Sequence, residues 1–153
     1  MNQVRPKKFL GQHFLTDLKI ASDIADTVDA CPDIPVLEVG PGMGVMTQFL
    51  LTKNREFKVV EIDRESVPYL QEHFPQLGEG IIEADFLKMD LHKVFDGRQF
   101  VLTGNYPYNI SSQIFFKIIE HRNLVPECVG MIQKEVAERI AEKEGSKTYG
   151  ILS

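Results

Sequence analysis

Short runs of apolar residues alternate along this chain with segments in which apolar residues recur every three or four positions. Runs of this length are typical of buried strands, and the segments between them have the length of helices. We expect strands at 36–39, 57–62, 80–84, 100–104 and 128–132, and helices at 45–52, 64–74, 111–121 and 134–144. The repeated strand–helix units predict an α/β fold with a doubly wound, mostly parallel sheet and right-handed crossovers.

One more helix is expected before the first strand. Its apolar positions are Ile20, Ala21, Ile24, Ala25 and Val28. This spacing places them on one helical face, and Thr16 is expected to cap the N-terminus of the helix. No internal repeat, low-complexity tract or linker breaks the pattern, so residues 1–153 are expected to form one domain.

The composition limits the class of protein. With 153 residues, of which 43% are hydrophobic, the chain can bury the core of one domain. No apolar run reaches the ~18 residues that a membrane-spanning helix needs. The first residues are polar and lack the apolar stretch of a secretory signal, so we expect a cytoplasmic protein with no membrane partner. Cys31 and Cys128 do not form a metal-type pair, which favours reduced thiols and no bound metal.

The charge does not by itself indicate a nucleic-acid partner, because the formal net charge is −5. Three basic residues, Arg5, Lys7 and Lys8, nevertheless gather near the N-terminus and are able to contact phosphate locally. A solvated tail explains the same residues equally well. The partner therefore has to be inferred from the motifs.

A glycine-rich turn follows the first expected strand. Gly40, Gly42 and Gly44 fall at every second position, and Glu38 stands two positions before the first glycine. Glycines at such a turn let a ligand approach the backbone, as in nucleotide-type pockets. A dinucleotide-binding turn would need glycine or alanine where Val45 stands, so the spacing favours S-adenosyl-L-methionine as the cofactor. We expect Glu38 and the three glycines to bind it; the alternative is a tight turn between core elements.

Acidic residues end the next two expected strands. Glu61 is expected to accept hydrogen bonds from both ribose hydroxyls of the cofactor, with Ile62 beside it. Asp63 is a competing choice, but we expect it to open the following helix as a cap. Asp85 is expected to accept from the adenine amine while Phe86 or its neighbours pack on the ring. The alternative for this aspartate is a turn former or a helix cap.

Asn105, Tyr106, Pro107 and Tyr108 follow the fourth expected strand and point to a substrate. The lone pair of the adenine amine is delocalised into the ring, so an enzyme that attacks through this nitrogen must hold it as it rehybridises. Asn105 is expected to accept N–H bonds from the amine, and Pro107 to stiffen the turn. Tyr108 offers a face on which an extruded base stacks for about 1 to 3 kcal/mol. An ordinary strand-to-helix turn is the alternative.

Six segments, in this order, resemble one protein family. They are Lys7 to Asp17, Glu38 to Gly44, Glu61 to Asp63, Ala84-Asp85, Asn105 to Ser111 and Gln133 to Val136. Together they resemble the small-subunit (16S) ribosomal RNA adenine N6,N6-dimethyltransferases, the kasugamycin-sensitivity methyltransferases of bacteria. The resemblance covers nearly the whole chain, and its Leu-Gly-Gln-His-Phe-Leu stretch at 10–15 is highly specific.

The resemblance implies a Rossmann-like methyltransferase with a role in small-subunit biogenesis. Its expected reaction is the transfer of two methyl groups from S-adenosyl-L-methionine to N6 of each of two adjacent adenosines near the 3′ end of 16S rRNA in a pre-30S particle. The cofactor-binding positions that it implies are His13, Leu15, Gly40, Glu61, Asp85 and Asn105, with Gln12 folding over the methionine end. No metal and no strong base are needed, because the sulfonium is already an activated methyl donor. Tyr106 stands where the family usually has Leu or Ile, and we do not expect it to be catalytic.

Family members continue with two more strands and a small helical domain. The chain is therefore expected to be the front portion of a longer enzyme, with weak or absent RNA methylation by itself. Its strand at 128–132 would be an exposed edge that invites self-association. Two alternatives stay open: a ribosome-assembly factor acting mainly by binding, and a large-subunit RNA adenine methyltransferase of the macrolide-resistance type, which the stretch at 10–15 disfavours.

Overall fold

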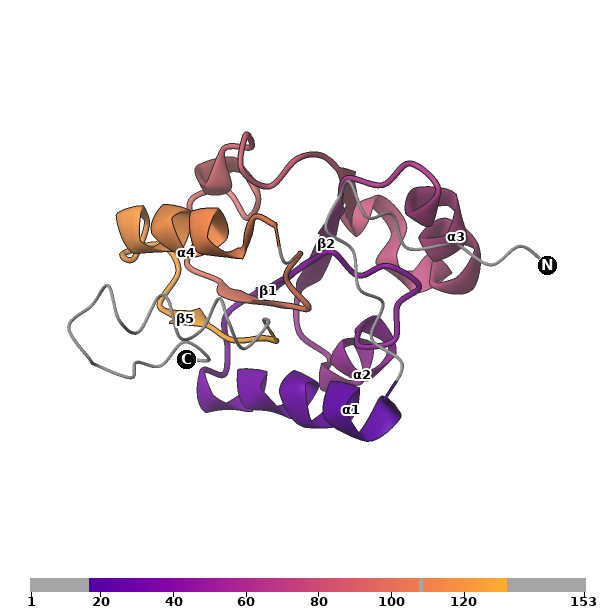
Figure 1. Cartoon of the computed structure of the whole chain (residues 1–153). Coiled ribbons are helices and arrows are strands. Elements are labelled where there is room, and N and C mark those ends of the chain that lie inside the picture. Colours follow the sequence, from indigo (N-terminus) through magenta and orange to yellow (C-terminus); the bar gives the residue numbers. More distant parts are fainter. Residues whose placement is uncertain (1–16, 108, 132–153) are drawn as a thin grey trace.

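Five parallel strands form the sheet at the centre of the fold (Figure 1). The computed structural model describes residues 17–107 and 109–131. The strands are β1 (Val36–Val39), β2 (Phe57–Glu61), β3 (Ile81–Glu83), β4 (Val101–Gly104) and β5 (Glu127–Cys128). Their order is β3-β2-β1-β4-β5, and each neighbouring pair is parallel. The predicted α/β fold with a parallel sheet is confirmed.

Helices cover both faces of this sheet. They are α1 (Leu18–Asp26), α2 (Thr47–Leu50), α3 (Ser66–His73) and α4 (Ser111–Glu120), with the 3-10 turns η2 (Thr27–Ala30), η3 (Leu51–Lys53), η4 (Pro75–Gly80) and η5 (Leu91–Lys93). The α2 helix is shorter than the expected helix at 45–52, because the glycine-rich turn runs on to Met46 and the last residues wind as η3. The expected helix at 134–144 lies outside the described residues. Within the described part of the chain, no helix is both long enough and apolar enough to span a membrane.

The N-terminus of α1 differs from the prediction by one residue. Asp17 is the N-cap, and its carboxylate accepts hydrogen bonds from the backbone N–H groups of Lys19 at 2.9 Å and Ile20 at 3.1 Å. The prediction of Thr16 as the cap is wrong. The helix begins one position later, where a carboxylate also complements the positive end of the helix dipole.

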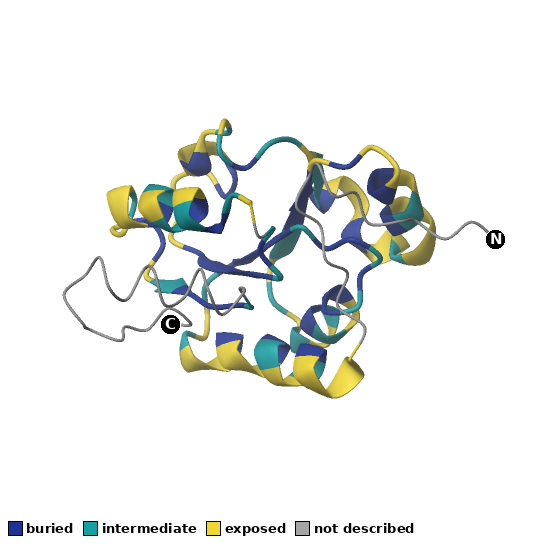
Figure 2. Cartoon of the chain, viewed as in Figure 1, coloured by how far each residue is buried: buried dark blue, intermediate teal, exposed yellow. Residues whose placement is uncertain are grey.

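The side chains of β1 alternate between two packing layers, so the strand is buried on both faces (Figure 2). Leu37 and Val39 belong to the larger apolar cluster, which includes side chains of α4 and η5. Val36 belongs to a second cluster, with side chains of α1 and α2. Burial on both faces explains why the strand reads as an apolar run broken only by Glu38.

The strand at the edge of this sheet is shorter than the apolar run predicts. The β5 strand ends at Cys128. Beyond it the N–H of Val129 donates to the carbonyl oxygen of Leu102 at 2.9 Å, and an isolated bridge joins Met131 to Asn105. Between them Gly130 has a φ of 152°, and a Cβ at this position would collide with the carbonyl oxygen of Gly104. The prediction of a continuous strand at 128–132 is therefore wrong for its described residues, because the strand ends at Cys128 and pairing resumes only as a bridge at Met131.

The order of the strands reverses at β1. From β1 the chain moves outward through β2 to β3, and then crosses to β4 on the other side of β1. In open α/β sheets, ligands bind beyond the carboxyl ends of the strands at such a switch point. The residues that follow β1 and β4 are the glycine-rich turn and the Asn105 turn. The topology therefore brings the two predicted motifs together.

Candidate functional site

The turn after β1 depends on its glycines. Gly40, Gly42 and Gly44 have φ angles of 68°, 59° and 82°, in the left-handed region that other residues disfavour. The N–H of Gly40 donates to the carbonyl oxygen of Val60 at 2.9 Å, so the turn begins where the ladder between β1 and β2 ends. A Cβ on Gly44 would collide with the ring of Phe74. The missing side chain at Gly44 thus makes room for Phe74, whereas at Gly40 it leaves the backbone open to a ligand.

The glycine-rich turn lies against the turn that follows β4. Val39 and Gly104 are register partners at the ends of their strands, and a Cβ on Gly104 would collide with the carbonyl oxygen of Val39. A Cβ built on Gly40 would lie 3.7 Å from the carbonyl oxygen of Asn105. Gly40 and Asn105 are therefore neighbours at the switch point, although they are far apart in the sequence.

Glu61 joins the end of β2 to the glycine-rich turn. Its side chain is almost fully buried. Oε1 accepts from the N–H of Gly42 at 3.0 Å, and Oε2 accepts from the N–H of Asp63 at 2.9 Å. Burial raises the pKa of this carboxyl, while the hydrogen bonds from the backbone oppose the rise. The carboxylate expected to bind the ribose thus lies directly beside the turn expected to bind the rest of the cofactor.

The two residues after Glu61 differ in exposure. Asp63 is buried, and its carboxylate accepts from the N–H of Glu65 at 3.0 Å and from the hydroxyl of Ser66 at 3.5 Å. This carboxylate fixes the turn before α3. The prediction that Asp63 caps the helix is wrong, because α3 begins at Ser66 with Glu65 as its N-cap. Ile62 is 43% exposed, which is unusual for a large apolar residue at a strand end. It leaves an apolar surface beside Glu61 for a ligand to cover.

Glu38 lies beneath the turn, on the face of β1 that meets α2. It is 1% exposed and accepts a hydrogen bond from the hydroxyl of Thr47 at 2.5 Å. Burial raises the pKa of Glu38 to about 8, so this carboxyl is mostly protonated at neutral pH. Thr47, a buried polar residue at the start of α2, was not among the predicted site residues. The hydrogen bond between Glu38 and Thr47 joins β1 to α2 across the glycine-rich turn.

Asp85 and Phe86 follow β3 and have different environments. Oδ1 of Asp85 accepts from the N–H of Leu87 at 3.0 Å, so this aspartate does form a turn, which was the alternative to a ligand contact. Asp85 is partly exposed, and the second carboxylate oxygen gives it further capacity to accept. Phe86 is 3% exposed and lies in the larger apolar cluster, with Nζ of Lys117 5.1 Å from its ring centroid. Its ring therefore supports the loop from the core side.

Tyr106 anchors the Asn105 turn in the core. It is 4% exposed, and its hydroxyl donates to the carbonyl oxygen of Val129 at 2.5 Å. Its backbone N–H donates to Met131 at 3.0 Å, and its ring meets Phe115 edge-on with centroids 5.4 Å apart. Burial raises the pKa of the phenol well above its ordinary value. A neutral, buried phenol with these contacts has a structural role, which agrees with our expectation that Tyr106 is not catalytic.

The next residues connect this turn to α4. The carbonyl oxygen of Pro107 accepts from the N–H of Ile110 at 3.3 Å and from the hydroxyl of Ser111 at 2.7 Å. Ser111 is buried at the first position of α4, so the turn and the helix are joined rigidly. Four of the predicted site residues, Gln12, His13, Leu15 and Tyr108, lie outside the described residues. In the described ranges, no group of three His, Cys, Asp or Glu side chains is arranged to hold a metal ion.

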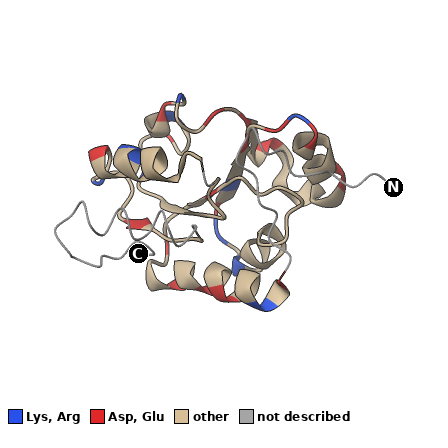
Figure 3. Cartoon of the chain, viewed as in Figure 1, with Lys and Arg blue, Asp and Glu red and all other residues tan. Residues whose placement is uncertain are grey.

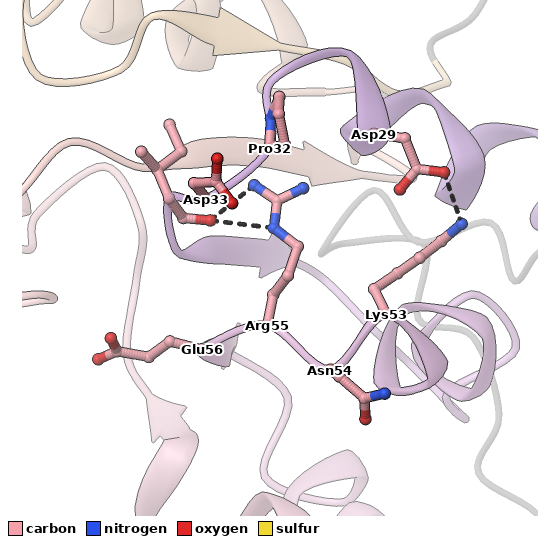
Figure 4. Close-up of a pocket in the computed structure, with 8 residues that line it drawn as sticks. Asp29, Pro32, Asp33, Lys53, Asn54, Arg55 and Glu56 are labelled. Atoms are coloured by element: carbon pink, nitrogen blue, oxygen red, sulfur yellow. Dashed lines mark hydrogen bonds and ion pairs between the residues drawn. The ribbon is translucent and has the colours of Figure 1, made fainter.

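A hollow at the opposite end of the strands is separate from these motifs (Figure 4). It has a volume of about 480 Å³ and is lined by Asp29, Pro32, Asp33, Ile34, Lys53, Asn54, Arg55 and Glu56. The Arg55 guanidinium donates to the carbonyl oxygens of Val28, Cys31 and Ile34 at 2.6 Å each. Because these backbone groups occupy its donors, Arg55 holds the segment before β1 in place. The hollow therefore carries a structural cluster and none of the predicted site residues.

Acidic and basic side chains are interspersed over the described helices and loops (Figure 3). Several are paired across elements, such as Arg98 with Glu56 at 2.7 Å. Such exposed pairs contribute little to stability. The basic residues Arg5, Lys7 and Lys8 lie outside the described residues.

A family model and two curated relatives both identify ribosomal RNA methyltransferases as the proteins that this chain resembles. Residues 3–153 match the family model described as "Ribosomal RNA adenine dimethylase". The chain is 72% identical over its full length to "Ribosomal RNA small subunit methyltransferase A" of Phocaeicola vulgatus and 71% identical to the protein of the same name from Bacteroides thetaiotaomicron, and it covers 55% and 57% of these relatives. The chain thus spans little more than half the length of the curated relatives it matches.

A solved structure supports the same assignment. The crystal structure of a dimethyladenosine transferase from Plasmodium falciparum superposes with a TM-score of 0.67 at 32% identity, over 84% of this chain and 46% of that protein. The five strands, the glycine-rich turn after β1 and the Asn105 turn after β4 all lie within residues 3–153, which the family model matches. On this evidence the chain belongs to the ribosomal RNA adenine dimethylase family.

Proposed function

We propose that the protein to which this chain belongs transfers methyl groups from S-adenosyl-L-methionine to N6 of two adjacent adenosines near the 3′ end of small-subunit rRNA. The observation that carries this proposal is the contact between the glycine-rich turn and the Asn105 turn at the switch point of the sheet. One turn fits a cofactor and the other fits a planar base with an exocyclic amine. The family membership of the chain supports the choice of RNA.

The residues of the first turn fit S-adenosyl-L-methionine. Left-handed glycines leave the backbone open, Glu61 offers carboxylate oxygens for the ribose, and the exposed side of Ile62 offers an apolar surface for the adenine ring. Asp85 would accept from the adenine amine, with Phe86 supporting its loop from the core. The residues that we propose to bind or support the cofactor are Gln12, His13, Leu15, Glu38, Gly40, Gly42, Gly44, Glu61, Ile62, Asp85, Phe86 and Asn105.

The second turn would position the target base. We propose that Asn105 accepts N–H bonds from the adenine amine, Pro107 keeps the turn stiff, and Tyr108 stacks on the extruded base. When bound, the cofactor supplies an activated methyl group on its sulfonium. Asn105 and the stacked base would then orient the amine in line with that group, which is the principal contribution required of the protein. The methylated amine is acidic enough to lose its proton to solvent, so these residues need not include a strong base.

The family relationship also sets the expected context. The substrate would be the rRNA within a pre-30S particle in the cytoplasm. Among the described strands, β5 forms one edge of the sheet, so the expected self-association of this chain through that edge stays a prediction.

The Asn105→Ala variant tests the proposed function. Removing the amide takes away the acceptor for N6 and leaves the glycine-rich turn and Glu61 in place. We expect methyl transfer to small-subunit RNA to be lost in the full-length protein, while its affinity for S-adenosylhomocysteine stays within a fewfold of wild type. Unchanged turnover would remove Asn105 from the reaction. A matched control is Asn109→Ala, an exposed amide in the same turn, which we expect to retain activity.

A further inference from the structure

Lys117 connects α4 to the loop that carries Asp85. Its Nζ donates to the carbonyl oxygens of Phe86 at 2.6 Å and Met89 at 2.7 Å, and it lies 5.1 Å from the centroid of the Phe86 ring. Phe86 belongs to the larger apolar cluster, and the Lys117 side chain is partly buried. An ammonium group in this position is held by two carbonyls and one aromatic face.

The loop after β3 is compact and turns two of its carbonyls toward α4. The carbonyl oxygen of Asp85 accepts from the N–H groups of Lys88 at 2.9 Å and Met89 at 3.1 Å, and Oδ1 accepts from Leu87 at 3.0 Å. These bonds fix the loop internally. The bonds from Lys117 fix its position relative to the rest of the fold.

The same helix is attached to the Asn105 turn at its other end. Ser111, the first residue of α4, donates to the carbonyl oxygen of Pro107 at 2.7 Å. Ser111 and Lys117 are less than two helical turns apart. One rigid segment of α4 therefore sets the distance between the loop of Asp85 and the turn of Asn105.

The charge of Lys117 also acts on Asp85. Burial lowers the pKa of this lysine, and Asp85 is the foremost of the neighbouring acids that oppose the fall. The Lys117 ammonium group and the Asp85 carboxylate therefore attract each other electrostatically. An ionised carboxylate offers only acceptors, which is what a purine amine requires.

We propose that Lys117 is a positioning residue that holds Asp85 where it accepts from the 6-amino group of the cofactor's adenine, and so sets the selectivity of the site for adenine. This inference rests on the proposed role of Asp85 in the function described above. Lys117 itself touches neither the cofactor nor the target base. Its effect is on the choice of purine rather than on the methyl transfer.

Selectivity for the amine gives a direct test in the full-length protein. The probes are S-adenosylhomocysteine and its analogue in which the purine lacks the 6-amino group, with dissociation constants from titration calorimetry. We expect wild type to prefer the amine-bearing probe by about tenfold or more, because the analogue leaves a charged acceptor unpaired. In Lys117→Met, which keeps the apolar stem, this ratio should fall to within about threefold as the acceptor loses its position. Lys117→Arg, which keeps the charge and the donors, should retain most of it.

Controls separate positioning from general damage. Lys93→Met removes an exposed ammonium from η5 in the same segment and should leave the ratio unchanged. If Lys117→Met does not fold, Lys117→Gln replaces it and should also lower the ratio. Equal loss of affinity for both probes, or an unchanged ratio, would overturn the inference.

The outcome for wild type distinguishes this inference from the proposed function. A wild-type protein that does not discriminate between the probes would also overturn the inference. If the same preparation still methylates small-subunit RNA, the proposed function survives and only the adenine contact of Asp85 is lost.

Discussion

Removing the hydroxyl of Tyr106 is expected to destabilise the fold at the Asn105 turn. This hydroxyl donates to the carbonyl oxygen of Val129 at 2.5 Å and lies 3.3 Å from Sγ of Cys128. The ring packs edge-on against Phe115, and a Cβ on Gly130 would lie 2.5 Å from it. The phenol therefore links the turn after β4 to the segment after β5 through a buried hydrogen bond.

The size of the effect follows from this burial. A hydrogen bond contributes about 1 kcal/mol net, and a buried acceptor left unpaired costs about 1–3 kcal/mol. Tyr106→Phe should therefore lower the free energy of unfolding by about 1–3 kcal/mol. Tyr106→Leu introduces a residue usual in the family, but it also removes the ring that fits against Gly130. Its cost should reach about 2–4 kcal/mol, because a cavity adds to the lost bond.

Urea unfolding of the purified chain, followed by circular dichroism, measures both changes. The midpoint should fall for each variant while the slope stays constant, which identifies a change in stability. Tyr69→Phe is the matched control, because this partly exposed tyrosine stacks on His73 at the surface of α3. We expect the control to change stability by less than about 0.5 kcal/mol. A Tyr106→Phe variant as stable as the control would refute the structural role of the phenol.

Three further predictions address the cofactor turn, the buried acid and the sheet edge. Gly40→Arg should abolish the binding of S-adenosylhomocysteine, measured by calorimetry, since φ is 68° and a side chain would enter the site. If the variant loses methyl transfer but still binds immature small subunits, methylation and particle binding are separable activities. Loss of particle binding as well would argue against a separate role in assembly. Glu38 has a pKa raised from 4.5 to about 8, so its contribution to stability is full below about pH 4.5 and is lost as pH rises through 8. Glu38→Gln should flatten this dependence by roughly a few kcal/mol in urea titrations at several pH values, and an unchanged profile would contradict it. Size-exclusion chromatography of this chain should show self-association through the edge at β5, and a strict monomer at high concentration would argue against it.

The parts of the fold that the sequence predicts are those that depend on local pattern. The runs at β1, β2 and β4 are apolar because helices bury both faces of the sheet, so burial is visible in the sequence itself. The glycine-rich turn could also be predicted from the sequence, since its three glycines all adopt left-handed φ angles that other residues disfavour. These features were enough to predict the parallel sheet and the two motifs that meet at its switch point.

The parts that the sequence does not predict depend on contacts between distant residues. Lys117 donates to a carbonyl 31 residues away, and the Tyr106 hydroxyl donates to one 23 residues away. No local pattern distinguishes such a lysine from one on a solvated helix face. The surroundings of β5 are equally hidden from the sequence, because only the assembled sheet shows how closely Gly130 approaches Gly104 and Tyr106.

The most direct test of the proposed function is mass mapping of small-subunit RNA after incubation with the full-length protein and isotope-labelled S-adenosyl-L-methionine. The account predicts two neighbouring dimethyladenosines near the 3′ end, and none with the Asn105→Ala variant under the same conditions. Label at another position, label in large-subunit RNA, or RNA that stays unmodified while the protein binds the cofactor would contradict it.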